Sequence, residues 1–258
     1  MIFYFSGTGN TKWAAEEIAK AIGERLLFIP DELREGHRTY SLESDERIGF
    51  CFPTHGWQVP RIVRDFIQQL TFHQQNRSLC PYCWALTTCG DNMGEAMTIL
   101  NKDLRQIGLS TDSSFAIVMP ESNVCFSFLH LDTPERERAK KQAAKQRLPH
   151  IIDIIKNKRS GYNELVKGAI PRIYSYVIGG YYNKHLITDQ KFWVDTETCI
   201  NCGLCKKVCP VGDIEGIPPS WRGDGACTNC LACYHHCPQH AIHWGKMKRG
   251  QYLFKDEP

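Results

Sequence analysis

The sequence predicts an α/β protein with two domains: a five-stranded parallel sheet with helices on both faces, followed by a small α+β domain that binds metal. In residues 1–160, short apolar runs alternate with segments whose apolar residues recur at helical spacing. Eight of the 13 cysteines lie between Cys199 and Cys237, so the end of the chain differs in composition. We therefore divide the chain into residues 1–160, an aromatic connector at residues 161–190, and residues 191–258.

The composition excludes several classes of protein. With 258 residues, 42% of them apolar and 23% charged, the chain suits two ordinary domains and is not a disordered polymer. No apolar run approaches the ~20 residues of a membrane helix, and no basic secretory signal precedes the first apolar run. The net charge of +3 comes from scattered residues, so nucleic acid is not an expected partner. Thirteen cysteines without a signal argue against disulfides, so we expect a cytoplasmic protein in a reducing compartment.

Five apolar runs predict the strands of the first domain. The run at residues 1–5 is almost wholly apolar, as expected for a strand buried on both faces of a sheet. Four more short runs of this kind follow at residues 26–29, 47–52, 83–88 and 114–119. Because helical segments separate them, these strands are expected to lie parallel in one open sheet.

Helical periodicity accounts for the segments between the strands. Residues 11–22 carry alanines and isoleucines at helical spacing, and a glycine follows them. A second helix is expected to start near Pro60, and a third to cover residues 94–107. The last is expected over residues 132–158, with Asp132 as its N-cap.

The connector at residues 161–190 fits neither pattern. It contains five tyrosines and a Gly-Gly pair. That composition is too aromatic for a flexible linker, so we expect the segment to pack against the rest of the protein.

A repeated cysteine motif carries the chemistry of the second domain. The spacing C-x2-C-x2-C-x3-C-P occurs twice, starting at Cys199 and at Cys227. Three cysteines at this spacing can hold three corners of a cubane cluster, and the fourth thiolate must come from elsewhere because the chain turns away at the proline. Zinc and disulfides are the alternatives, but zinc sites use paired C-x2-C knuckles rather than triplets followed by C-P.

This segment resembles bacterial-type two-cluster ferredoxins over nearly its whole length. In that family the fourth cysteine of each run binds the other cluster. The resemblance therefore implies two 4Fe-4S clusters, one bound by Cys199, Cys202, Cys205 and Cys237, and the other by Cys209, Cys227, Cys230 and Cys233. Three histidines lie beside these ligands and are expected on the surface, with tuning of a cluster as the alternative: His235, His236 and His240.

A glycine-rich loop follows the first predicted strand and opens the first helix. It consists of Ser6, Gly7, Thr8, Gly9, Asn10 and Thr11. A helix N-terminus offers free N–H groups and a positive dipole end, and the hydroxyl and amide side chains add donors, so the loop suits a terminal monophosphate. It lacks the third glycine of a dinucleotide fingerprint and the lysine of a Walker loop. The alternative is an ordinary turn between a strand and a helix.

The loop resembles the FMN phosphate loop of flavodoxins, in which two further loops at the carboxyl ends of strands hold the flavin ring. The resemblance places the first of these at Pro53, Thr54, His55, Gly56 and Trp57. It places the second at Thr88, Cys89, Gly90, Asp91 and Asn92. Trp57 is expected to stack on the flavin, with hydrophobic packing as the alternative.

The chain as a whole resembles flavodoxin–ferredoxin fusion proteins of anaerobes, with a flavodoxin-like domain first. The resemblance implies FMN and 4Fe-4S clusters as cofactors and electron transfer between them as the function, with redox proteins as partners. The alternative is a flavoenzyme that reduces a small molecule at FMN. Residues 121–131 and 174–182 distinguish the two, since they either roof a substrate pocket over the flavin or dock the two domains. No residue of the protein is expected to be catalytic.

Overall fold

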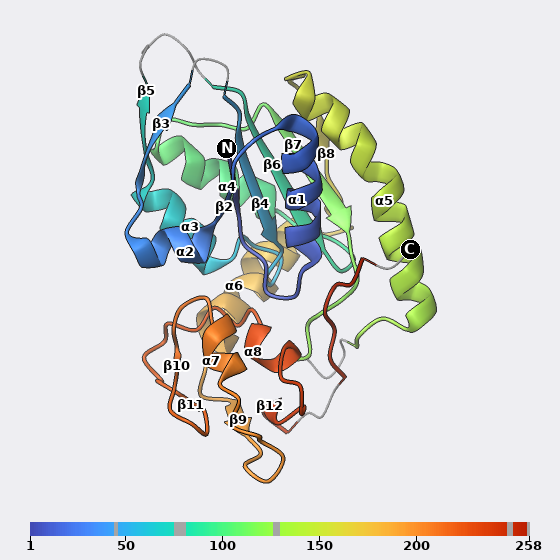
Figure 1. Cartoon of the computed structure of the whole chain (residues 1–258). Helices are drawn as coiled ribbons and strands as arrows, with labels where there is room; N and C mark the ends of the chain where they lie inside the picture. The colour runs from blue at the N-terminus through green and yellow to red at the C-terminus, as the bar shows by residue number, and fades with distance from the viewer. Residues whose placement is uncertain (44–45, 75–80, 126–129, 247–249, 257–258) are drawn as a thin grey trace.

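A parallel β-sheet forms the centre of the first domain in the computed structural model, which describes residues 1–43, 46–74, 81–125, 130–246 and 250–256 (Figure 1). Six described strands pair in it, and every neighbouring pair is parallel. In order across the sheet they are β2 (Leu26–Phe28), β1 (Ile2–Tyr4), β4 (Ile48–Pro53), β6 (Cys83–Cys89), β7 (Ser113–Val118) and β8 (Asn163–Glu164). The predicted α/β class with a parallel sheet is confirmed, and the short edge strand β8 is an addition that the sequence did not predict.

The order of the strands fixes where a ligand can bind. Apart from β8, the strands lie in the order second, first, third, fourth and fifth along the chain. This is the flavodoxin-like order of doubly wound sheets, in which ligands bind at the carboxyl ends of the strands, beside the point where the winding reverses. That point lies between β1 and β4, whose carboxyl ends lead into the glycine loop and the loop of residues 53–57.

Helices cover both faces of the sheet (Figure 1). One face is covered by α1 (Asn10–Ile22) and α5 (Pro134–Lys156). The other is covered by α2 (Ile29–Glu35), α3 (Arg61–Gln69) and α4 (Ala96–Gln106). Each face has its own buried core, which is why the strands are apolar at nearly every position. Within the described part of the chain, no helix is long and apolar enough to cross a membrane.

Several predicted boundaries are shifted by one or two residues, and two of these shifts have a clear physical reason. Ile29 begins α2 instead of ending the second strand, because Pro30 suits the first turn of a helix. The N-cap of α5 is Thr133 rather than Asp132. The Thr133 hydroxyl accepts a hydrogen bond from the backbone N–H of Arg136 at 3.3 Å.

A separate two-stranded parallel sheet was not predicted. It consists of β3 (Thr39–Leu42) and β5 (Thr71–Gln74). Tyr40 and Leu42 alternate with exposed residues along β3 and point into the core of the α2, α3 and α4 face. Strands this short, with only two buried side chains, leave little periodicity for sequence analysis to detect.

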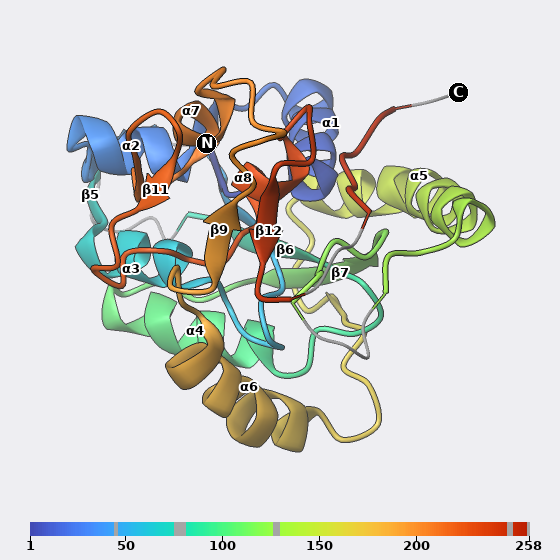
Figure 2. The same ribbon diagram turned by 90° about the horizontal axis from the view of Figure 1, so that it is seen from below.

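The connector becomes a helix with wide hydrogen-bonded turns where it covers the carboxyl edge of the sheet. Its successive parts are a π-helix at Ile173–Ile178, α6 (Gly179–Tyr181) and a π-helix at Tyr182–Leu186. Ser175 fixes this helix, because its hydroxyl donates to the Trp57 carbonyl and accepts from the Glu95 N–H, both at 2.7 Å. Figure 2 shows α6 beside α4, beneath the sheet.

The second domain lies against the carboxyl edge of the sheet (Figures 1 and 2). Its strands form two antiparallel pairs: β9 (Phe192–Val194) with β12 (Ile242–Trp244), and β10 (Ile214–Glu215) with β11 (Ser220–Trp221). Its helices α7 (Leu204–Val208) and α8 (Ala232–His235) each contain the third cysteine of a motif. Cysteines of both motifs pack with buried strand residues in one core, so the motifs organise this domain.

The C-terminal segment, residues 250–256, connects the second domain back to the first. The Gln251 amide donates to the Cys237 carbonyl at 2.8 Å. Three residues later, the Phe254 N–H donates to the Thr8 carbonyl at 2.8 Å. The glycine loop and the end of the second cysteine motif are therefore held by one short piece of chain.

The packing of β4 on β6 gives a direct test of the first core. A Cβ at Gly49 would overlap the ring of Trp84, which is fully buried. We expect Gly49→Ala to lower the free energy of unfolding by about 1–3 kcal/mol, because overpacking forces side chains off their rotamers. Gly180→Ala is the matched control, since a Cβ there meets no heavy atom within 4 Å. Chemical denaturation followed by circular dichroism measures both, and equal stability of the two variants would contradict the prediction.

Candidate functional site

A cavity lies at the carboxyl edge of the sheet, where the two domains meet. Its volume is about 70 Å³, which accommodates about five water molecules at roughly 10–15 Å³ each. Its walls come from the glycine loop, the loops after β4, β6 and β7, the connector and the second cysteine motif. Both domains therefore contribute to one site, at the edge where the strand order predicts ligand binding.

The glycine loop is held rigidly at one end of this cavity. Ser6 Oγ accepts a hydrogen bond from the N–H of Gly9 at 3.1 Å, and Gly9 has a φ of 100°, which favours glycine. The Thr11 hydroxyl lies 2.7 Å from that of Thr88, at the end of β6. These contacts fix the loop before any ligand binds, with the N-terminus of α1 directed at the cavity.

Asn10 has a larger structural role than its sequence position indicates. Its Nδ2 donates to the Pro120 carbonyl at 2.9 Å, and its Oδ1 accepts from the Tyr252 hydroxyl at 2.6 Å. An amide nitrogen carries two hydrogens, so one side-chain N–H remains for a ligand. Asn10 thus joins the glycine loop to the loop after β7 and to the C-terminal segment.

Most residues of the three loops proposed from sequence line the cavity. They are Ser6, Gly7, Thr8, Asn10, Thr11, Pro53, Thr54, His55, Thr88, Cys89 and Gly90. The others lie outside its walls: Gly9, Gly56, Trp57, Asp91 and Asn92. The structure thus brings nearly the whole glycine loop together with the first residues of the two other loops and directs the later residues of those two loops elsewhere.

Trp57 and Asp91 have other partners. The Trp57 ring stacks on Tyr174 of the connector, with centroids 5.3 Å apart and planes 16° apart. Asp91 pairs with Arg136 at 2.7 Å, and its side chain is 64% exposed. The packing alternative for Trp57 therefore describes its contacts in this structure, because the connector supplies an aromatic surface that the loop alone does not reveal.

Several residues of the cavity wall were not named individually from the sequence, although four of them lie in the segments 121–131 and 174–182 that were expected to roof a pocket or to dock the domains: Pro120, Glu121, Ser122, Asn123, Tyr182, Asn229 and Leu231. They belong to the loop after β7, to the connector and to the second cysteine motif. The available signal was the extra length of residues 121–131 and the tyrosines of the connector. Residues 126–129 of that loop lie outside the described residues.

Two titratable side chains in the wall are shifted toward their neutral forms. Burial raises the pKa of Glu121, although the N–H groups of Ser122 and Asn123 donate to its Oε1 at 2.9 and 2.7 Å. Burial also lowers the pKa of His55 to about 4, although a hydrogen bond to the Thr228 backbone acts to raise it. At neutral pH His55 is therefore uncharged, and a larger fraction of Glu121 is protonated than in water.

The cysteines form two groups, each combining three residues of one motif with the fourth of the other. The outer group lines a cavity of its own: Cys199, Cys202, Cys205 and Cys237. The inner group consists of Cys209, Cys227, Cys230 and Cys233. Burial is the largest cause that raises the pKa values of the Cys227, Cys230 and Cys233 thiols, and the nearby Cys209 raises all three further. Each group thus contains the four cysteines that a 4Fe-4S cluster uses as ligands.

The two motifs repeat the same backbone conformation. Asn201 and Gly203 have left-handed φ angles in the first, and Asn229 and Leu231 have them at the equivalent positions of the second. These turns direct N–H groups at sulfur: for example, the N–H of Asn229 donates to Cys227 Sγ at 3.3 Å. Hydrogen bonds to sulfur are one of the means by which proteins set cluster potentials.

The inner group lies directly against the glycine loop, and the outer group faces solvent. A Cβ at Gly7 would lie 2.5 Å from the Cys230 carbonyl oxygen, so the two backbones are in contact. In the outer group, Cys202 is exposed, and its neighbours Ile200 and Ile217 are 59% and 64% exposed. The domain thus presents one cysteine group to the cavity and the other to the outside.

His235 corrects the expectation of surface histidines near the ligands. It is 1% exposed, Nε2 donates to the Ser122 carbonyl at 2.8 Å, and Nδ1 accepts from the Tyr252 N–H at 3.0 Å. These two bonds specify a neutral ring, and burial lowers its pKa to about 4. His236 is half-buried and His240 is exposed.

Comparison with known solved structures finds proteins similar in part to the first domain. A putative flavoprotein from Bacteroides uniformis is 18% identical, and the match covers 46% of this chain and 88% of that one, with a TM-score of 0.34. Megasphaera elsdenii flavodoxin is 20% identical over 56% of this chain and 99% of that one, with a TM-score of 0.31. An azoreductase from Bacillus anthracis is 10% identical over 60% of this chain and 98% of that one, with a TM-score of 0.34.

Sequence comparison identifies the second domain. Residues 191–238 match the 4Fe-4S dicluster domain family. An uncharacterized ferredoxin of Methanocaldococcus jannaschii is 39% identical over 59 residues, which cover 19% of this chain and 70% of that protein. Through this domain, the chain belongs to the 4Fe-4S ferredoxins, whose electron-transfer chemistry it combines with an α/β domain of flavodoxin-like strand order.

Proposed function

We propose that the chain transfers electrons between two 4Fe-4S clusters and FMN, and exchanges them with a redox partner protein. The observation that carries this proposal is the shared wall of the cavity, where the glycine loop faces Cys230 and Leu231 of the second cysteine motif. When bound, the clusters supply single electrons and FMN accepts one or two. A contact between the two binding loops provides a short path between the cofactors.

We assign one cluster to each cysteine group. The outer group would hold the first cluster, in the cavity that all four of its cysteines line. The inner group would hold the second, and the mutual charge interactions of its thiols support this grouping. The crosswise exchange of Cys209 and Cys237 is the pattern of two-cluster ferredoxins.

The glycine loop would bind the FMN phosphate through neutral donors. The hydroxyls of Ser6, Thr8 and Thr11, the amide of Asn10 and the start of α1 all border the cavity, and no lysine or arginine occurs among its described lining residues. A terminal phosphate suits such a set of donors and the dipole of a 13-residue helix. The cavity has room for the phosphate group but not for the flavin ring as well. Binding of the ring therefore requires wall residues such as Tyr182 to move.

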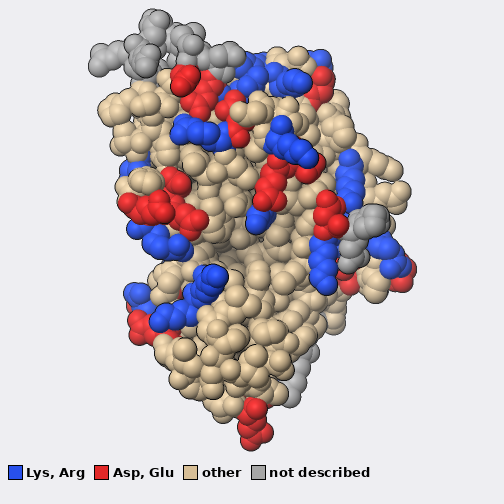
Figure 3. All heavy atoms as spheres, viewed as in Figure 1, with Lys and Arg blue, Asp and Glu red and all other residues tan. Residues whose placement is uncertain are grey.

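The partner protein would exchange electrons at the outer group. Cys202 is exposed beside Ile200 and Ile217, so the edge of this cavity is apolar and accessible. Figure 3 shows that charged side chains on the viewed face gather over the first domain, while the second domain is mostly uncharged there. A redox protein with an apolar contact surface suits this end of the chain, because transient redox interfaces are small and need close approach.

Cofactor analysis of two cysteine variants tests the electron path. Wild-type protein purified without oxygen should contain about eight iron, eight sulfide and one FMN per chain. Cys209→Ala should lose about half of the iron and keep FMN, and its flavin should be reduced more slowly by an external one-electron donor, because the cluster beside the cavity is missing. Cys237→Ala, the matched variant, should lose the outer cluster instead. Full iron in both variants would contradict the crosswise ligands, and iron without flavin would contradict FMN.

A charge in the glycine loop tests the phosphate site. Thr8 is 7% exposed and lines the cavity. We expect Thr8→Glu to weaken FMN binding by at least tenfold, since a like charge within a few ångströms of the phosphate costs more than about 1.4 kcal/mol. Thr8→Ser keeps the hydroxyl and should bind FMN nearly as well as the wild type. Flavin fluorescence titration of the apoprotein measures both, and undiminished binding by the Glu variant would place the phosphate elsewhere.

Reduction of a small molecule at FMN is the second candidate function, and Glu121 favours it. Glu121 lines the cavity and its pKa is raised by burial, so it could hold a proton for a substrate that FMN, when bound, would reduce there. For such an enzyme, Glu121→Gln should slow reoxidation of the reduced flavin by a small quinone, and leave reoxidation by a redox protein unchanged. An unchanged rate with the quinone would favour the carrier function.

A further inference from the structure

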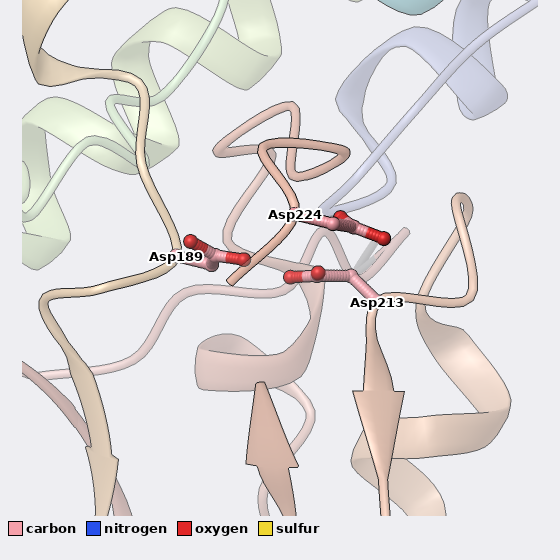
Figure 4. A group of neighbouring side chains, drawn as sticks. All are labelled: Asp189, Asp213 and Asp224. Carbon is pink, nitrogen blue, oxygen red and sulfur yellow. The ribbon is translucent and has the colours of Figure 1, made fainter. Parts of the chain in front are cut away.

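Three carboxylates from distant parts of the sequence meet on the second domain, outside the walls of the cavity and beside Cys209 of the inner cysteine group. Asp189 ends the connector, Asp213 precedes β10, and Asp224 lies between β11 and the second motif. One carboxylate oxygen of each lies within 4.8 Å of the others. Figure 4 shows the carboxylates of Asp189 and Asp213 facing each other, with that of Asp224 above them.

Asp213 is the unusual member of this cluster. It is 1% exposed, and within the described residues neither of its carboxylate oxygens has a hydrogen-bond partner. Its backbone is fully engaged, since its N–H donates to Cys209 Sγ at 3.3 Å and its carbonyl accepts from the Arg222 N–H at 3.0 Å. A buried carboxylate without donors is strongly unfavourable, so this side chain is either protonated or placed beside a positive partner.

The surrounding contacts hold the other two carboxylates in place without neutralising the cluster. Asp189 Oδ2 accepts from the Gly223 N–H at 2.8 Å, and Asp224 Oδ1 accepts from the Ala226 N–H at 2.9 Å. The Arg222 guanidinium pairs with Asp224. A single guanidinium against three carboxylates leaves a net negative charge in a partly buried space.

We propose that Asp189, Asp213 and Asp224 bind a divalent cation of the oxygen-preferring class, with Ca²⁺ as the best match. An all-carboxylate set is typical of Ca²⁺, Mg²⁺ and Mn²⁺ rather than of zinc or iron–sulfur chemistry. Ca²⁺ tolerates irregular geometry and completes its shell with water, whereas Mg²⁺ demands a near-ideal octahedron. Ligands from three separate segments suit the more tolerant ion.

Such an ion would join the connector to the ferredoxin domain. Asp189 belongs to the segment that follows Tyr182 of the cavity wall. The backbone N–H of Asp213 donates a hydrogen bond to Cys209 Sγ of the inner group. Binding would therefore stabilise the placement of the connector on the second domain. This site is independent of FMN, so its test does not depend on the proposed electron transfer.

Calorimetric titration of Ca²⁺ into the anaerobically purified, EDTA-treated and desalted holoprotein tests the site. One ion should bind per chain, and the midpoint of thermal unfolding should rise with Ca²⁺ concentration, because the folded state alone presents the three carboxylates together. Asp213→Asn should weaken binding at least tenfold. Glu215→Gln is the matched control, since Glu215 is exposed on β10 and pairs with Arg222 at 3.9 Å but is not one of the three carboxylates, so the variant removes a nearby negative charge without removing a ligand and should bind nearly as the wild type does.

Three outcomes would overturn the proposal. One is no binding of Ca²⁺ to the wild type at about 1 mM, the weak limit of protein calcium sites. Another is binding that Asp213→Asn leaves unchanged. The third is an Asn variant that is more stable than the wild type with or without metal, which would show that Asp189 and Asp213 share a proton. If Asp213→Asn does not fold, the exposed Asp224→Asn provides the same comparison.

Discussion

The backbone contact between Gly7 and Cys230 is the constraint on which the arrangement of the two domains depends. A loop at the end of β1 can approach a cysteine ligand loop this closely only where it has no side chain. Other contacts hold the same interface: the Arg61 guanidinium donates to the Cys227 carbonyl at 2.9 Å, and the Phe254 N–H donates to the Thr8 carbonyl. The ferredoxin domain is thereby fixed over the edge where a doubly wound sheet binds its ligand.

The two cysteine groups differ in their surroundings. The inner group is desolvated, so its thiols have strongly raised pKa values, whereas Cys202 of the outer group is exposed. Clusters in unlike environments have unlike potentials, because solvent exposure and hydrogen bonds to sulfur both act on them. Two clusters held in these groups would therefore differ in potential, although the two motifs have the same cysteine spacing.

Sequence patterns predicted those features that are local or periodic. Five apolar runs gave the parallel strands, and the motif spacing indicated which cysteines gather. Features created by tertiary contact were not predictable: Trp57 stacks on Tyr174 because the connector helix lies there, and His235 is buried by the Ser122 loop and Tyr252. The short strands β3 and β5 were missed because four residues carry too little periodicity.

The connector links the occupancy of the cavity to the inner cysteine group. The Tyr182 ring lines the cavity, and its hydroxyl accepts a hydrogen bond from Asn229 Nδ2 at 3.0 Å. The N–H of the same asparagine donates to Cys227 Sγ at 3.3 Å. A ligand that displaces Tyr182 must therefore break its hydrogen bond to Asn229, the residue whose backbone N–H donates to Cys227 Sγ. Since hydrogen bonds near sulfur affect cluster potentials, a ligand that fills the cavity would alter the surroundings of the inner cysteine group.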